Sequence, residues 1–246
     1  MKLSALIAAH SRGGHVEFFL EPSDDLLYAM DMRDISALYK LTDEVFSASG
    51  LDPKSADTTA FQRTVTKRAG GVSVQFVRRQ HMLFNYEDTC QATWLLSHLF
   101  HRQEDRVDYP AIQDPVNTIA TKFRITKRLP DGEQLSLKER IVACRFVERE
   151  RTVLVWKATL TGEGSCAGMQ TDETGWSVIR PSATGSGTIM EGCMRQDPAH
   201  LHTIVDPAVA NRFDKFLQSI IQENSQEITN GAKAVLLENM LSGICA

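Results

Sequence analysis

A helical spacing of apolar side chains is the first recognisable pattern along the chain. In DMRDISALYKLTDEVFSASG (residues 31–50) apolar or aromatic residues recur every three or four positions, and Gly50 and Pro53 follow as helix-ending signals. We therefore expect an amphipathic helix over residues 31–50. The preceding residues contain SRGG and EPSDD, which interrupt regular structure, so residues 1–30 are expected to form a loosely structured leader.

From Asp57 the pattern changes to the alternation that is typical of strands. TTAFQRTVTKR and GVSVQFVRRQHMLFN are rich in β-branched and aromatic residues, and Gly70-Gly71 between them predicts a hairpin turn. YEDTCQATWLLSHLF (86–100) returns to helical spacing. The stretch HRQEDRVDYPAIQDP (101–115) is polar and is expected to be irregular.

Several strands then follow with no helix between them. The segments are NTIATKFRITKRL, QLSLKERIVACRFV, TVLVWKATL, TGWSVIRP and TIMEGCMR, joined by short turns that favour antiparallel pairing. The charged stretch ERER (148–151) is expected to be a solvent-exposed hairpin tip. Asp206-Pro207 then opens a long amphipathic helix, which Gly231 could kink or divide.

Alternation within each strand separates an apolar face from a more polar one. Leu154 and Trp156 share one face of TVLVWKATL, whereas Lys157 lies on the other, as expected for a sheet packed on one side only. The last strands depart from this rule, because Arg180 and Glu191 share faces with apolar residues. Such charges could protect an edge, form a surface patch or serve as polar anchors in a cavity.

Composition narrows the class of protein. The 246 residues are 42% hydrophobic and 24% charged, with a net charge of -4 and no basic stripe, which argues against nucleic-acid binding. Five scattered cysteines, never in a CxxC pair, predict reduced thiols in the cytoplasm or the nucleus. The apolar piece at residues 3–9 contains a serine and is at the lower length limit for a signal peptide, so we expect none. No stretch is long enough to span a membrane.

Catalytic and metal motifs are weak throughout the sequence. His98, His101 and Glu104 have a spacing that could bind a metal, but we expect solvated side chains at a helix end. The glycine-rich turns lack the lysine of a phosphate-binding loop, and no GxSxG or GxGxxG occurs. We therefore expect no catalytic residues, no metal, no cofactor and no enzymatic activity. One enzymatic alternative stays open, a polar dyad of Arg180 with Glu191 inside a cavity.

The order of elements resembles the START (StAR-related lipid-transfer) domain. The matching segments are ERTVLVWKA, ETGWSVIRPS with GTIMEGCMR, and the helix from Pro207, within residues 31–246. The resemblance implies a single α+β domain with the helix-grip fold, in which a curved antiparallel sheet wraps around a long C-terminal helix. At the place of the Arg-Asp pair that many START domains carry, this chain has Glu139-Arg140.

The resemblance also implies a function. We expect the chain to bind a lipid or other hydrophobic small molecule in an internal cavity, and to contact membranes transiently during lipid transfer or sensing. We expect no nucleic-acid partner. The alternative is a protein-interaction module of the same shape with a filled interior, and the oligomeric state stays open. The candidate cavity residues are Phe123, Leu154, Trp156, Trp176, Arg180, Met190, Glu191, Phe213, Phe216, Leu217 and Ile220.

Overall fold

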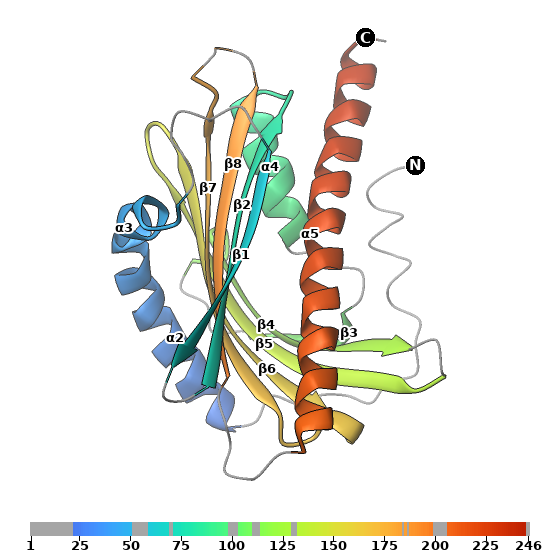
Figure 1. The fold of residues 1–246 in the computed structure, drawn as a ribbon. Helices are drawn as coiled ribbons and strands as arrows, with labels where there is room; N and C mark the ends of the chain where they lie inside the picture. The colour runs from blue at the N-terminus through green and yellow to red at the C-terminus, as the bar shows by residue number, and fades with distance from the viewer. Residues whose placement is uncertain are drawn as a thin grey trace.

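The computed structural model describes residues 22–50, 59–68, 71–97, 103–109, 114–128, 132–183, 185, 187–198 and 206–244. Eight antiparallel strands form one sheet that curves around a long C-terminal helix, which confirms the expected α+β helix-grip architecture (Figure 1). Within these ranges, no helix is both long enough and apolar enough to cross a membrane.

The sheet has the strand order β1-β2-β8-β7-β6-β5-β4-β3, so β1 and β3 are its edges. Strands β3 to β8 pair successively along the chain, as do β1 and β2, and the pairing of β2 with β8 joins these two groups. The strands are β1 Ala60–Arg68, β2 Gly71–Met82, β3 Glu104–Asp108, β4 Thr118–Arg128, β5 Gln134–Val147, β6 Thr152–Glu163, β7 Gln170–Pro181 and β8 Thr188–Pro198.

The C-terminal helix α5 (Pro207–Ile244) and the short helix α4 (Tyr86–Ser97) lie on the side that we call the inner face. The Asp206 carboxylate accepts a hydrogen bond from the backbone N–H of Ala208 at 2.8 Å, which caps the first turn of α5 as expected. Gly231 neither ends nor divides this helix. A Cβ there would lie 3.1 Å from Leu96 of α4, so the glycine allows the two helices to approach closely.

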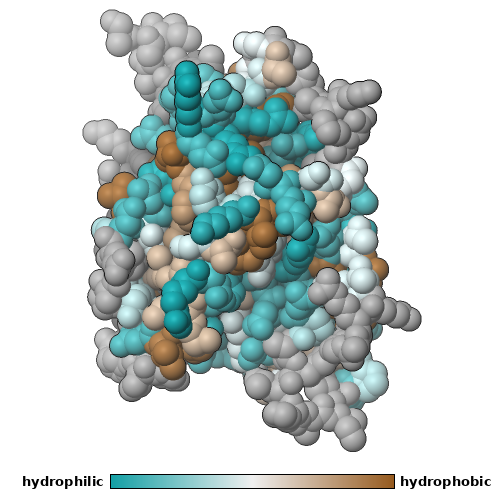
Figure 2. Space-filling model, turned by 90° about the vertical axis from the view of Figure 1, so that its left-hand side faces the viewer, coloured by the Kyte–Doolittle hydropathy of each residue, from teal (hydrophilic) through white to brown (hydrophobic). Residues whose placement is uncertain are grey.

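Helices α2 (Pro22–Lys40) and α3 (Thr42–Ser47) pack on the opposite, outer face, which corrects the expectation of a sheet covered on one side. Val153 and Val155, on the second face of β6, are fully buried beneath α2. Figure 2 looks onto this side of the molecule and shows apolar patches set among hydrophilic side chains. Burial of both faces explains why the middle strands carry so many consecutive apolar residues.

The structure also corrects the position of the first helix. Helix α2 begins at Pro22, so residues 22–30, which we assigned to the leader, are helical; residues 1–21 lie outside the described part. The segment PSDD (22–25) starts this helix, because proline at the first position and acidic residues in the first turn both favour a helix start. A short strand, β3, also occupies part of the stretch expected to be irregular.

The charged tip between β5 and β6 is attached to the outer-face helices and is not simply solvated. Tyr39 of α2 stacks on Phe146 with ring centroids 4.0 Å apart, and its hydroxyl donates to Glu148 at 2.9 Å. Arg151 binds Asp43 of α3 and also Glu148 at 2.8 Å. The tip therefore anchors α2 and α3 to the end of the β5–β6 hairpin.

Candidate functional site

Two separate apolar clusters hold α5 against the inner face, one toward each end of the helix. The first joins the N-terminal half of α5 to β4, β5 and β6, and the second joins its C-terminal half to α4 and the opposite ends of the strands. Phe213 and Phe216 are at most 3% exposed in the first cluster, and Ala232 and Leu236 at most 2% in the second. Both ends of the space between helix and sheet are therefore closed by packed side chains.

Between the clusters lies a region where both walls are less well buried, which we call the central band. On the sheet it contains Ile141, Trp156 and Met194, which lie at the centre of the inner face yet are only partly buried. On α5 the positions that continue the packed stripe, Asn224 and Ile228, are also only partly buried. Side chains in a filled core would be fully buried, so the central band is where the helix and the sheet pack least tightly.

Polar side chains cross the central band and connect α5 to the sheet. The Arg78 guanidinium of β2 donates a hydrogen bond to the Ser225 hydroxyl, and the Thr229 hydroxyl donates to the Gln80 side chain at 3.1 Å. Burial lowers the pKa of Arg78. No carboxylate pairs with Arg78 among the described residues, so its guanidinium has further N–H donors for an acceptor in this space.

Trp156 lies flat against the backbone of β7 within the central band. A Cβ built on Gly175 would come within 2.0 Å of the Trp156 ring, so only glycine leaves room for the indole there. The indole N–H donates to Glu173 at 2.8 Å, and this bond fixes the orientation of the ring. An aromatic face at the centre of the inner wall can contact an apolar ligand.

Two glutamates share the inner face with Trp156. Glu173 of β7 accepts hydrogen bonds through both carboxylate oxygens, from Trp156 and, at 2.9 Å, from the Gln196 amide of β8. Glu139 of β5 lies between Phe123 and Leu160 in the register, which places it on the same face. Burial, together with the nearby Glu173, raises the pKa of Glu139 to about 8, and burial also raises the pKa of Glu173.

The candidate residues from the sequence separate into two groups. Eight lie on the inner face or on the side of α5 that packs on it, namely Phe123, Leu154, Trp156, Met190, Phe213, Phe216, Leu217 and Ile220. Of these, only Trp156 belongs to the central band, whereas the other seven are packed in the two closed clusters. Whether any of the eight contacts a ligand stays a prediction.

The other three candidates lie on the outer face of the sheet, which corrects their expected position in a cavity beneath α5. They are Trp176, Arg180 and Glu191. Trp176 pairs in register with Val155, so it packs beneath α2 and donates its N–H to the Leu38 carbonyl at 3.0 Å. Arg180 and Glu191 do form a pair, at 3.3 Å, but on the outer face, where Glu191 also binds Arg79 at 2.6 Å. A catalytic dyad of these two beneath α5 is thereby excluded.

Glu139, Glu173 and Arg78 are polar groups of the inner face that the sequence analysis did not select. Alternation could have indicated Glu139, because it shares a strand face with Leu135 and Leu137, which are at most 2% exposed. Glu173 and Arg78 could not be found in this way, since their position depends on the pairing of β7 and β2 with their neighbours.

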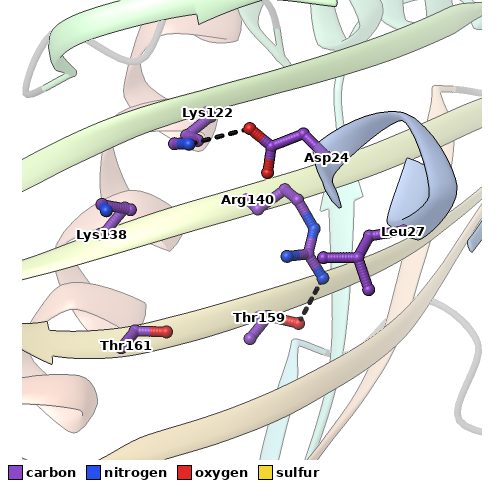
Figure 3. Close-up of a pocket in the computed structure, with 7 residues that line it drawn as sticks. All are labelled: Asp24, Leu27, Lys122, Lys138, Arg140, Thr159 and Thr161. Carbon is purple, nitrogen blue, oxygen red and sulfur yellow. Dashed lines mark hydrogen bonds and ion pairs between the residues drawn. The ribbon is translucent and has the colours of Figure 1, made fainter. Parts of the chain in front are cut away.

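A separate depression of about 170 Å³ lies on the outer face, beside the first turns of α2 (Figure 3). Its walls are formed by Asp24, Leu27, Lys122, Lys138, Arg140, Thr159 and Thr161. Lys122 and Asp24 form an ion pair at 2.9 Å in which both side chains are almost fully buried. Arg140 donates to Thr159 at 3.2 Å and approaches Asp31 at 3.8 Å. These contacts attach α2 to the sheet, and the polar walls suit no hydrophobic ligand.

Metal chemistry receives no support from the described ranges, where no three His, Cys, Asp or Glu side chains gather in an arrangement that could bind a metal ion. His98 and His101, which have a suggestive spacing in the sequence, lie outside the described residues. The buried thiols of Cys144 and Cys193 have raised pKa values because they are desolvated.

Comparisons with known proteins find similarity in structure alone. No protein-family model matches the sequence, START domains included, and no curated protein matches it. The crystal structure of Ara h 8.0201 is similar with a TM-score of 0.40 and 12% sequence identity, over 68% of this chain and 99% of that chain. A protein of unknown function from Staphylococcus aureus gives a TM-score of 0.38 and 11% identity, over 69% of this chain and 96% of its own.

Proposed function

We propose that this protein binds a hydrophobic small molecule, such as a lipid, between the inner face of the sheet and α5, without catalysing a reaction. The central band carries this proposal. There, partly buried apolar side chains of the sheet face α5. At this point polar side chains, and not close apolar packing, connect the helix to the sheet. An apolar ligand there would gain about 25 cal/mol for each Å² of apolar surface removed from water.

The order of the elements supports a relation to START domains, which we retain as a proposal. Helix α5 would then act as the lid, because its middle can separate from the sheet by breaking three polar contacts. These contacts are Arg78–Ser225, Gln80–Thr229 and Lys127–Glu223. A protein that moves a lipid between membranes would contact a membrane while the lid is open. The net charge of -4 would favour zwitterionic over anionic membranes in such a contact.

A substitution that fills the central band tests the proposal. Ala143 lies on β5 opposite Trp156 and is partly buried, so Ala143→Trp should occupy the space and prevent binding of a hydrophobic fluorescent dye. Val147→Trp is the matched control, because Val147 is on the same strand and is 69% exposed. Native mass spectrometry of the purified protein should show a bound lipid that the Ala143→Trp variant lacks.

Equal dye and lipid binding by the Ala143→Trp variant and the wild type would contradict the proposal, provided that both unfold at similar temperatures. If Ala143→Trp unfolds too easily, Met194→Trp on β8 makes the same test from the other side of Trp156. Absence of any bound lipid, with no dye binding by the wild-type protein, would favour the alternative of a filled interaction module.

A further inference from the structure

The Glu173 carboxyl group is partly buried, and the described residues supply no cation to it. Its two hydrogen-bond donors, the Trp156 indole and the Gln196 amide, are both neutral, and no ion pair forms with it in the described part of the chain. Both donors favour the ionised form of Glu173, against the effect of burial. Buried charges in proteins are normally paired, so Glu173 lacks the partner that such a group usually has.

Glu139 is a second carboxyl group that can accept further hydrogen bonds. Its side chain is 8% exposed, and its carboxyl accepts no hydrogen bond from any described residue. It lies within electrostatic reach of Glu173, diagonally across β6, where Glu139 pairs with Leu160 and Glu173 with Ala158. A desolvated carboxyl group beside a carboxylate retains its proton at neutral pH, and that proton can be exchanged for another positive charge.

The charged groups that face this pair do not neutralise it. Arg78 of β2 bonds to Ser225, and Lys127 of β4 forms an ion pair with Glu223 of α5 at 2.6 Å. Arg63 of β1 lies over the Phe76 ring on the same face. Arg145, at the α4 end of β5, lies over the Trp94 ring. None of these cations bonds to Glu139 or Glu173, so the carboxyl pair itself favours a cationic ligand over an anionic one.

We propose that Glu139 and Glu173 together bind the ammonium group of a hydrophobic amine whose apolar chain lies along the central band. This inference rests on the proposed function and specifies the chemical class of the ligand. The ammonium group would donate to the open Glu139 carboxyl and supply the counter-charge of Glu173, while Trp156 offers an aromatic face to its neighbouring methylene groups.

Binding of the amine changes the protonation of the site in a measurable way. In the free protein Glu139 carries a proton at neutral pH, and in the complex its charged form pairs with the ammonium group. About one proton is therefore released for each amine bound, which follows from linkage between binding and protonation. A neutral alcohol of the same chain length would leave that proton in place.

Calorimetric titration with dodecylamine, dodecanol and dodecanoic acid, each below its micelle concentration, tests the inference. We expect dodecylamine to bind at least about tenfold more tightly than the alcohol and the acid. Only the amine supplies a positive charge to the carboxyl groups of Glu139 and Glu173. Repeating the amine titration in two buffers of different ionisation enthalpy should reveal the released proton. Glu139→Gln should reduce amine affinity about tenfold and abolish proton release, with little effect on the alcohol.

Glu150→Gln is the matched control, because Glu150 is exposed at the β5–β6 tip. Glu173→Gln is a second variant and should also weaken the amine selectively. Binding of all three ligands with equal affinity, or unchanged amine binding and proton release by Glu139→Gln, would overturn the amine site but not the proposed function. If dodecanoic acid bound most tightly of the three ligands, the amine site would be overturned, and Arg78 would be the polar contact instead. Failure of all three ligands to bind would overturn both proposals.

Discussion

Substitution of Gly175 by alanine should displace Trp156 from its position on the inner face. The added Cβ would lie 2.0 Å and 2.1 Å from two carbons of the indole ring, far inside van der Waals contact. Since β7 is held by ladders to both β6 and β8, the indole must move instead of the backbone. The displaced ring then loses the 2.8 Å bond from its N–H to Glu173.

The cost follows from these two effects. Overpacking of a well-packed position costs about 1–3 kcal/mol, and loss of a hydrogen bond to a charged group about 1.5–3 kcal/mol. Because the central band gives the indole somewhere to move, we expect the lower half of the combined range, about 3 kcal/mol. Urea unfolding of Gly175→Ala and the wild type measures the difference.

Gly192→Ala provides a matched control on the neighbouring strand. A Cβ at Gly192 would be no closer than 3.4 Å to its nearest neighbour, Arg78, so this variant should lose less than about 1 kcal/mol. In a Trp156→Ala background, Gly175→Ala should become nearly neutral, because the clashing ring is gone. An equal cost of Gly175→Ala in the Trp156→Ala background and in the wild type would refute the clash as its cause.

Three further predictions concern the rest of the molecule. Lys122→Met leaves the Asp24 carboxylate buried without its cation and should cost about 3–5 kcal/mol in urea unfolding; a loss below about 1 kcal/mol would contradict a buried pair. The pKa of Glu139 is about 8 in the folded protein against 4.5 as the ordinary value, so between these two pH values only the folded protein keeps the proton. Its contribution to stability is therefore full below about pH 4.5, decreases as the pH rises, and is lost above about pH 8. The stability of the wild type relative to Glu139→Gln should therefore fall with rising pH across that window, by up to about 1.4 kcal/mol per pH unit, and a flat difference would contradict the shift. Thiol reagents should react slowly with the native Cys245→Ser variant, since burial raises the pKa of every remaining thiol; rapid reaction would show that one is accessible. These thiols are Cys90, Cys144, Cys166 and Cys193.

Sequence patterns predicted the strands and the last helix well, because period and turn residues are local properties. The alternation in TVLVWKATL placed Trp156 and Leu154 on the inner face, and Asp206-Pro207 marked the start of α5. Local pattern was also sufficient at EPSDD, where proline followed by acidic residues signals a helix start. That signal was interpreted as a break, so the N-terminal half of α2 was missed.

The site could be predicted only in part, because the register between two strands determines which of their residues share a face of the sheet. Trp176 alternates correctly within β7, yet its pairing with Val155, and not with Trp156, places it beneath α2. The same dependence hides the carboxyl pair, since Glu139 and Glu173 are on strands separated by β6. Nothing in the sequence alone indicates that these two side chains share one face.

The attachment of α5 has a consequence for how its backbone fluctuates. A helix usually frays at its ends, but here apolar clusters hold both halves, while the middle is connected through the polar side chains of Arg78, Gln80 and Lys127. Transient opening should therefore start near Ser225, as a local bulge that leaves both anchored halves in place. Amide hydrogens around that residue would then exchange with solvent faster than those near Phe216 or Leu236, and a ligand filling the central band would slow them selectively.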